Sequence, residues 1–477
     1  MKIVPVFGNG VAGKSFNVTR ERRLNCYIEN RPDGDKSKAI VYGTPGLVYA
    51  FNTGYSQLTR GMLGTQSNLF VVTGKYIQKW NANGTVGLQT TIGSSSGFVS
   101  MAYSPTQLVI VDGSGGYIVR LSDLFTQTIT AAGFPAGCKT VTFSGGYFVV
   151  ESPGTQQFFV SGLFDATTWS ALSFASASQY SDNLVAVDQL VGNLVLLSNR
   201  HTEFWQNVGS TPQPYAPILS ATNEYGLAAT YSRAHVNGTI CFLAQSPQGI
   251  AQFCQINGYS VSVISTPDLD YIINQFPTYT DAVALSYMTD GHPMYQVTFP
   301  TANRSFIWDA STTIWSEVQT GVSQGWASRH QGQFSAYAGG TTYISDYQNG
   351  NIYTLSSTAY TDNGAIIPRE ITTRHAVDNH NRFTVDEIYL DMEMGVGVNL
   401  NNQGSNPTIL LDVSQDNGHT FSTPRSLTIG KLGKYKNRVI ARRFGTARDF
   451  VFRFRMTDPV KFVVTGGAMS VREERQP

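Results

Sequence analysis

The chain contains 477 residues, of which 41% are hydrophobic and only 14% are charged, and its formal net charge is +1. Charged residues make up roughly a quarter of an average globular domain, so this chain is poor in charge. Its 46 glycines and 12% aromatic content favour an all-β protein over a helical or disordered one. A net charge near zero excludes a global attraction to nucleic acid or membranes, and no apolar run is long enough for a membrane-spanning helix.

Residues 1–44 lack a regular hydrophobic pattern and are predicted to form an N-terminal arm. Inside this arm, Gly8–Ser15 fits the phosphate-binding pattern G-x-x-x-x-G-K-[ST], and Leu108–Asp112 further along resembles a Walker B strand. A phosphate-binding loop needs a helix directly after it, because the helix amides hold the phosphates. The residues that follow here, Phe16–Thr19, are poor helix formers. The sequence therefore predicts a glycine-rich arm that binds no nucleotide, and no cofactor is expected elsewhere.

Seven segments share one pattern, in which an alternating apolar run, a turn and a second apolar run follow one another as in a β-hairpin. They are residues 68–80, 107–121, 146–161, 193–207, 239–255, 293–309 and 341–355. Their starts are separated by 39 to 54 residues, and the mean is about 45. A repeat of this length accommodates four strands, which is the size of a β-propeller blade. We therefore predict a six- or seven-bladed β-propeller over residues 45–368, with a string of β-sandwiches as the alternative.

The composition changes near residue 368. The chain before this point carries 17 basic and 20 acidic residues, whereas the remainder carries 16 and 12. Apolar strand patterns continue in this remainder, at residues 386–398, 407–421, 438–444, 449–456 and 461–467. This spacing predicts a separate C-terminal β-sandwich over residues 369–477.

Ser414–Phe421 matches the Asp-box pattern S-x-D-x-G-x-T followed by an aromatic residue. Its polar side chains can hold turn amides and its glycine permits a tight turn, so it predicts the end of a β-hairpin. The same motif recurs in sialidases, which are propellers, and this leaves a propeller glycosidase as an alternative function. Such an enzyme needs two carboxylates about 5–10 Å apart. Asp391 and Glu393 could supply them, although an ordinary surface pair is the favoured interpretation.

Two further groups of residues could carry metal or redox chemistry. His375 and His380, with Asp378 between them, lie in a segment without the regular spacing that fixes metal ligands, so we predict solvated loop residues and no metal. Four scattered cysteines without a CxxC pair argue against a zinc site and a disulfide framework: Cys26, Cys138, Cys241 and Cys254. Cys241 and Cys254 flank one predicted hairpin and could be neighbours, but a bridge between them is not favoured.

Residues 425–455 contain ten basic residues and a single acid, Asp449, which gives a local net charge of +9. The basic residues are Arg425, Lys431, Lys434, Lys436, Arg438, Arg442, Arg443, Arg448, Arg453 and Arg455. Such a field could face nucleic acid or an acidic protein surface, or it could be a solvated face of the sandwich. Few aromatic residues are interleaved with these cations, which argues against a base-stacking surface.

A series of short stretches resembles one protein family in order along the chain. The N-terminal ones are Asn25–Glu29 (N-x-Y-x-E), Thr44–Leu47 (TPGL) and Arg60–Met62 (RGM). The middle ones are Thr202–Gly209, Pro214–Tyr215, Ile264–Thr266 and Ile272–Ile273, and the C-terminal ones are Gly430–Arg438 and Arg442–Arg453. The resemblance covers residues 23–475. The family is the packaged-DNA stabilisation, or tail-nozzle (tail-hub), protein of short-tailed bacteriophages.

The resemblance implies a structural virion protein and not an enzyme. Members form a homohexameric ring below the head–tail adaptor, retain the packaged genome and form the channel for DNA ejection. The implied partners are other copies of the chain, the adaptor, a fibre, spike or needle protein, and double-stranded DNA that passes without sequence specificity. The implied location is the virion tail, after synthesis in the bacterial cytoplasm. A conduit should not bind its cargo tightly, so we expect the basic cluster to contact an acidic partner surface.

Overall fold

The computed structural model describes residues 2–3, 10–33, 35, 37–81, 84–322, 327–398 and 402–473. Within these residues nearly all regular structure is β-strand, and the one α-helix is α1 (Pro267–Ile273). The all-β class predicted from composition is therefore confirmed. No helix in these ranges is long and apolar enough to cross a membrane.

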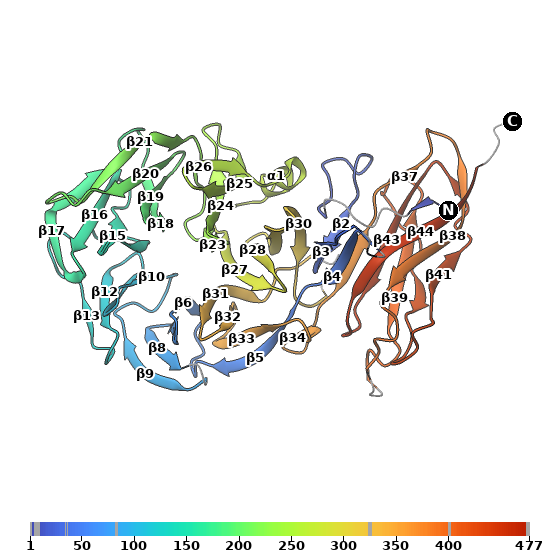
Figure 1. The fold of residues 1–477 in the computed structure, drawn as a ribbon, viewed down its shortest axis with the longest axis horizontal. Helices are drawn as coiled ribbons and strands as arrows, with labels where there is room; N and C mark the ends of the chain where they lie inside the picture. Colours follow the sequence, from blue (N-terminus) through green and yellow to red (C-terminus); the bar gives the residue numbers. More distant parts are fainter. Residues whose placement is uncertain are drawn as a thin grey trace.

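Residues 46–356 form a ring of seven blades, each built around four antiparallel strands, in the described part of the chain (Figure 1). Blade 1 contains β6 (Thr59–Gly64), β7 (Asn68–Thr73), β8 (Tyr76–Asn81) and β9 (Val86–Thr91). Blade 2 contains β10 (Ser100–Tyr103), β11 (Gln107–Val111), β12 (Gly116–Arg120) and β13 (Thr126–Thr128). Blade 3 contains β14 (Val141–Ser144), β15 (Tyr147–Glu151), β16 (Gln157–Gly162) and β17 (Asp165–Ser176).

The remaining blades follow the same order, from the strand nearest the ring axis outward. Blade 4 contains β18 (Leu184–Leu190), β19 (Asn193–Ser198), β20 (Thr202–Asn207) and β21 (Tyr215–Asn223). Blade 5 contains β22 (Gly226–Leu227), β23 (Ala234–Val236), β24 (Thr239–Gln245), β25 (Ala251–Asn257) and β26 (Ser260–Val263). Blade 6 contains β27 (Val283–Thr289), β28 (His292–Phe299), β29 (Arg304–Asp309) and β30 (Ile314–Val318). Blade 7 contains β31 (Gly332–Ala338), β32 (Thr341–Asp346), β33 (Asn351–Ser356) and β5 (Gly46–Asn52).

The seven hairpins predicted from the sequence are the two middle strands of the seven blades. These strands are covered by a neighbouring blade on each face, and their side chains alternate between the two. In β11, Val109 and Val111 pack with blade 3, whereas Leu108 and Ile110 pack with blade 1. All four side chains are fully buried. The apolar runs in the sequence reflect this burial on both faces.

The ring closes through a strand from the N-terminal side of the chain. β5 forms the outermost strand of blade 7 by pairing antiparallel with β33, with Leu47 opposite Leu355. Across the closure, the ring of Phe51 stacks on Trp80 of blade 1 at a centroid distance of 3.8 Å. This closure was not evident in the sequence, because β5 and β33 lie about 300 residues apart.

Two sheets pack face to face to form the predicted C-terminal β-sandwich (Figure 1). One contains β1 (Lys2–Ile3), β3 (Cys26–Asn30), β4 (Ala39–Gly43), β38 (Phe383–Met392), β41 (Val439–Arg442), β42 (Thr446–Ala447) and β44 (Val463–Glu473). The other contains β2 (Arg22–Leu24), β36 (Arg369–Thr372), β37 (Ala376–Val377), β39 (Thr408–Ser414), β40 (Arg425–Thr428) and β43 (Asp449–Met456). A short hairpin, β34 (Thr361–Asp362) and β35 (Ala365–Ile366), precedes this domain.

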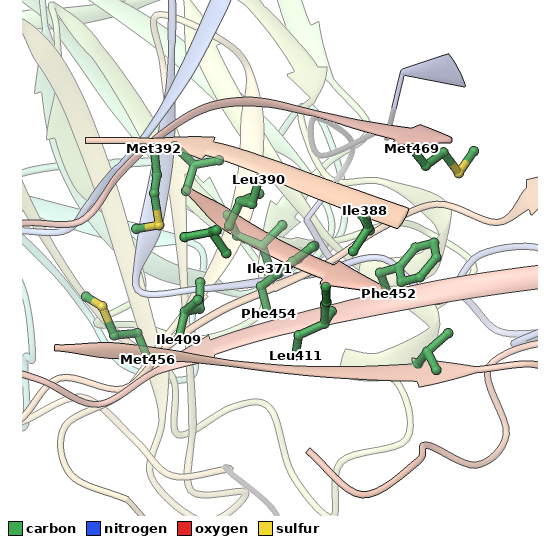
Figure 2. Packing of buried hydrophobic residues seen from close by; sticks show 14 of the residues in the cluster. Ile371, Ile388, Leu390, Met392, Ile409, Leu411, Phe452, Phe454, Met456 and Met469 are labelled. Carbon is green, nitrogen blue, oxygen red and sulfur yellow. The ribbon is translucent and has the colours of Figure 1, made fainter. Parts of the chain in front are cut away.

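The sandwich core lies between these sheets. Figure 2 shows side chains of β38, such as Leu390, facing side chains of β39 and β43, such as Leu411 and Phe454. All three are at most 2% exposed. The core therefore uses alternate residues of strands that the sequence pattern had identified.

β2 joins the two domains into one continuous sheet. It pairs in parallel with β30 of blade 6, where Leu24 lies opposite Glu317, and antiparallel with β36 of the sandwich, where Leu24 lies opposite Glu370. Together with β3 and β4, this strand lies in the segment predicted to be an N-terminal arm. Residues 22–43 are thus largely built into the sandwich sheets, while the domain boundaries at residues 44 and 368 stay predictions.

Candidate functional site

The ten basic residues predicted to form one cluster separate into two places. Arg453 and Arg455 lie on the face of β43 that points away from the sandwich core, and both donate hydrogen bonds to the buried carboxylate of Asp412. Arg453 also stacks over Phe421, with its guanidinium carbon 3.9 Å from the ring centroid. These two arginines are half-buried. They belong to the structure of the domain junction and not to an open basic surface.

Seven other members of the cluster are exposed, namely Lys431, Lys434, Lys436, Arg438, Arg442, Arg443 and Arg448. Most of them lie in or next to residues 431–438, here called the basic loop, which connects β40 to β41. The loop also exposes 54% of Leu432 and 74% of Tyr435. Arg442 pairs with Glu387. No ion pair is found for the other six within the described chain. The last member, Arg425, donates hydrogen bonds to backbone carbonyls of Arg442 and Arg443.

The phosphate-binding pattern at the N-terminus does not form a phosphate-binding loop over its described residues, 10–15. Val11 is buried in the propeller core beside α1, and the amide of Lys14 donates a hydrogen bond of 3.1 Å to the carboxylate of Asp268. The described residues directly after Ser15 form a turn and not a helix. An amide that donates to a carboxylate is not free to hold a phosphate oxygen, so the Lys14 amide does not take the role that it has in a phosphate-binding loop. That Gly8–Ser15 binds no nucleotide stays a prediction. Residues 8 and 9 lie outside the described residues.

The Asp-box motif forms the turn between β39 and β40, as predicted. The hydroxyl of Ser414 donates to Asp416 at 2.7 Å, and the amide of Thr420 donates to the same carboxylate at 2.9 Å. These hydrogen bonds lower the pKa of Asp416 to about 2. Its glycine, Gly418, faces Arg20 of the N-terminal segment, whose Nε donates to the Gly418 carbonyl at 3.1 Å. The motif therefore serves as a docking point for residues 10–20.

The candidate metal and glycosidase residues have structural contacts. The two ring nitrogens of His375 face the carboxylate of Asp449 at 2.5 Å and the carbonyl of Phe16 at 2.7 Å. Within the described ranges no group of three His, Cys, Asp or Glu side chains is arranged to hold a metal. Glu393 forms an ion pair with Lys461 at 2.8 Å, which agrees with an ordinary surface role.

Cys241 and Cys254 lie on neighbouring strands but on opposite faces of blade 5. Cys241 is opposite Gln255 in the register, and Cys254 is opposite Phe242. The two thiols therefore point into different cores, one shared with blade 6 and one shared with blade 4. All four cysteines are free and buried.

Charged residues on the propeller axis were not identified from the sequence. Blade 5 has an innermost strand in two pieces, and the break between β22 and β23 carries Tyr231 and Arg233 into a cavity of 720 Å³ on the axis. There Asp188 of β18 accepts hydrogen bonds from Arg233 at 3.0 Å and His235 at 2.9 Å. Burial acts to raise the pKa of Asp188, but these two partners and the Gln189 amide lower it to about 2. The sequence does not indicate these contacts, because Asp188 belongs to blade 4 and its two partners belong to blade 5.

Two family models match this chain, and together they cover most of it. One, described as "Bacteriophage P22 Gp10, beta-propeller", matches residues 6–360, and the other, described as "Bacteriophage P22 Gp10, beta-sandwich", matches residues 368–472. No curated protein matches. Both matches agree with the resemblance stated above and with the two domains of the structure.

The solved structures that match this chain are distant in sequence, and their TM-scores are low. The N-terminal domain of Nup159 is 11% identical with a TM-score of 0.41, over 70% of this chain and 98% of that chain. The Neurospora crassa Pan2 WD40 domain is 9% identical with a TM-score of 0.41, over 66% and 95%. The computationally designed Ika8 protein is 8% identical with a TM-score of 0.38, over 73% and 99%. The family models therefore carry the assignment: the chain belongs to the bacteriophage P22 Gp10 family of short-tailed phages and is a structural protein of the phage tail.

Proposed function

We propose that this chain is the subunit of a tail-nozzle ring that lies below the head–tail adaptor, retains the packaged DNA and forms the channel through which the DNA leaves. The observation that supports this most directly is the match of both family models, in order, over residues 6–360 and 368–472. A protein in this position is a homohexamer, and it carries a fibre, spike or needle protein at its distal end. It is found in the virion tail after synthesis in the host cytoplasm.

We further propose that the basic loop contacts an acidic surface, either on the neighbouring subunit or on the adaptor. Lys431, Lys434 and Lys436 are exposed on this loop of the sandwich domain. The side chains of Leu432 and Tyr435, which lie among them in the sequence, are exposed as well. A surface made only for solubility would mix both signs of charge. Cations at the rim of an apolar contact favour fast and specific association with a surface of opposite charge.

Retention of DNA by filled heads tests the proposed function. Heads packaged in a phage that lacks this gene product should lose their DNA unless purified protein is added. We expect the added chain to restore nuclease-resistant DNA in proportion to the protein bound. If heads bind the protein and still release their DNA at the unprotected rate, the proposed role in DNA retention is wrong.

The alternative function, a propeller glycosidase that digests a surface glycan, finds no particular support in the geometry of Glu393, which is paired with Lys461. The same purified protein can be incubated with fluorogenic glycosides and host surface glycan. Turnover that is lost in a Glu393→Gln variant would favour the enzyme.

A further inference from the structure

A cavity of 480 Å³ lies where blade 6, α1, the N-terminal segment and the sandwich meet. Five cationic side chains line it, which are Lys14, Arg20, Arg22, Arg304 and Arg453. Only two carboxylates line it, Glu317 and Glu370. Five positive charges against two negative ones leave an excess of three positive charges at the walls. This excess cannot be seen in any one stretch of sequence, because the residues come from four separate segments.

Both carboxylates are already neutralised by neighbours. Glu317 pairs with Arg22 at 2.8 Å and with Arg304 at 2.9 Å, and Glu370 pairs with Arg22 at 3.3 Å. Their side chains are only 5% and 4% exposed. Arg453 has its own partner, Asp412, behind the cavity wall. The positive charges that remain belong to Arg20 and Lys14.

Arg20 and Lys14 have no carboxylate partner for their side chains among the described residues. The Nε of Arg20 donates to the carbonyl of Gly418, and its guanidinium carbon lies 4.1 Å from the centroid of the Phe16 ring. The ammonium of Lys14 lies 5.2 Å from the centroid of Tyr271. Burial lowers the pKa of Arg20; Glu370 opposes this shift, and the charges of Arg453 and Arg22 add to it. Like charges are therefore crowded here, and although Glu370 and Glu317 partly offset them, both carboxylates form their ion pairs with Arg22 and Arg304.

The arginines at this cavity are held in fixed orientations. Phe16 and Phe421 each stack on one guanidinium group, at 4.1 Å for Arg20 and 3.9 Å for Arg453. A stacked guanidinium group keeps its N–H donors in the plane of the group, at the edge of the ring, where they can bind an anion. Gly418 leaves the space for Arg20, because a Cβ there would lie 2.8 Å from the Arg20 Cγ.

We propose that this cavity binds a phosphate group. A phosphate carries up to two negative charges and several acceptor oxygens, which suits two oriented arginines and a lysine better than a single carboxylate does. The side chains of Lys14, Arg20 and Arg453 bind it, in contrast to a phosphate-binding loop, where backbone amides do so. A bound phosphate links the N-terminal segment to the sandwich and stabilises the junction between the two domains.

The phosphate can come from a free ion or from the backbone of a nucleic acid strand, and competition separates these sources. Purified full-length protein is titrated with pyrophosphate by isothermal titration calorimetry at low ionic strength, and thermal unfolding is followed in parallel. We expect saturable binding and a rise in melting temperature with ligand concentration. A single-stranded oligonucleotide without terminal phosphates is then added. Competition with pyrophosphate assigns the site to nucleic acid, and lack of competition assigns it to the free ion.

The variants Arg20→Gln and Lys14→Gln should each weaken pyrophosphate binding by roughly tenfold, because each removes one charge-assisted contact. Arg120→Gln is the matched control, since Arg120 also stacks on a phenylalanine, Phe125, but lies on the surface of blade 2. Lys14 is exposed, so its variant should fold even if Arg20→Gln does not. The proposal is wrong if the wild-type protein shows no saturable binding of pyrophosphate. It is also wrong if Lys14→Gln binds pyrophosphate as tightly as the wild type and the Arg120→Gln control do.

Discussion

At the scale of single residues, buried charges hold the blades and the domain junction in place. Arg60 shows this well, because its guanidinium donates hydrogen bonds to the carbonyls of Gly74, Ser94, Ser96 and Gly97. It is only 4% exposed. It fixes the connection that leads from blade 1 to blade 2. Not every buried charge is held in this way, because Arg369 is 1% exposed and its Nε and Nη1 have no hydrogen-bond partner within the described residues.

The ion pair on the propeller axis makes the stability of the protein depend on pH. The pKa of Asp188 is lowered to about 2 in the folded protein, against about 3.9 in an unfolded chain. A carboxylate with a lowered pKa stabilises the fold above the unfolded value, and this contribution of about 2 kcal/mol is lost as the pH falls from about 4 towards 2.

The variant Asp188→Asn should therefore unfold more easily than the wild type by at least about 2 kcal/mol at pH 6. The difference should shrink as the pH falls below 4. Urea unfolding at a series of pH values measures it, with the exposed Asp123→Asn as the control. A difference that stays constant from pH 6 to pH 3 would show that the Asp188 charge contributes nothing.

Gly418 has two reasons to be glycine. Its φ of +82° lies in the left-handed region, and a Cβ would lie 2.8 to 3.2 Å from side-chain atoms of Arg20. Gly433 has a similar φ of +79° but open space around it. We expect Gly433→Ala to cost about 1 kcal/mol for the backbone alone and Gly418→Ala to cost more. Gly418→Ala should also expose residues 10–20 to limited proteolysis. Equal costs and equal proteolysis would show that the contact with Arg20 is unimportant.

At the scale of strands, the sequence predicts local pairings well and distant ones poorly. The middle hairpins of the blades were identified because both strands and their turn lie within about 16 residues and are buried on both faces. The outer strand β9 was not identified, because nearly all of its side chains are exposed and its sequence does not alternate between apolar and polar residues. β5 and β2 were missed because each pairs with a strand roughly 300 residues away.

The basic residues of the candidate site also differ in how far apart in the sequence their contacts lie. The count of ten basic residues was correct, but their proximity in sequence did not predict proximity in space. Arg453 and Arg455 point to Asp412, which lies some forty residues earlier, and this pairing depends on the register of β39 against β43. The basic loop could be recognised because it is contiguous. The cavity at the domain junction could not, because it combines residues 14, 20, 304 and 453.

Closure of the propeller ring by β5 gives a prediction at this scale. Phe51 is 8% exposed, and its ring stacks on Trp80 at 3.8 Å. The variant Phe51→Ala should lose about 3–5 kcal/mol of unfolding free energy, because it leaves a cavity where blade 7 meets blade 1. Phe125→Ala, at a residue that is 55% exposed, should lose less than about 1 kcal/mol. Urea unfolding that gives similar losses for the two variants would contradict closure through β5.

At the scale of the whole molecule, the basic loop should act in assembly. Simultaneous Lys431→Glu, Lys434→Glu and Lys436→Glu substitutions reverse the charge of an exposed segment. We expect the folded variant to bind filled heads at least roughly tenfold more weakly at low salt, with the difference reduced at high salt.

The matched control reverses three exposed cations on the propeller, Lys75, Arg120 and Arg200. Both triple variants change the net charge by the same amount, so a general effect of charge would weaken the binding of both variants to heads equally. Circular dichroism checks that each is folded. If the loop variant binds heads as the wild type does at both salt concentrations, the loop is ordinary solvated surface.

We expect this Gp10-family chain to work as a closed ring around a channel. Electron microscopy of the purified full-length protein, alone and bound to adaptor-bearing heads, tests it most directly. We expect class averages of a six-fold ring with an open central pore on the axis of the head vertex. A protein that stays monomeric even on the heads, or that attaches at the periphery of the vertex away from the DNA path, would contradict the account.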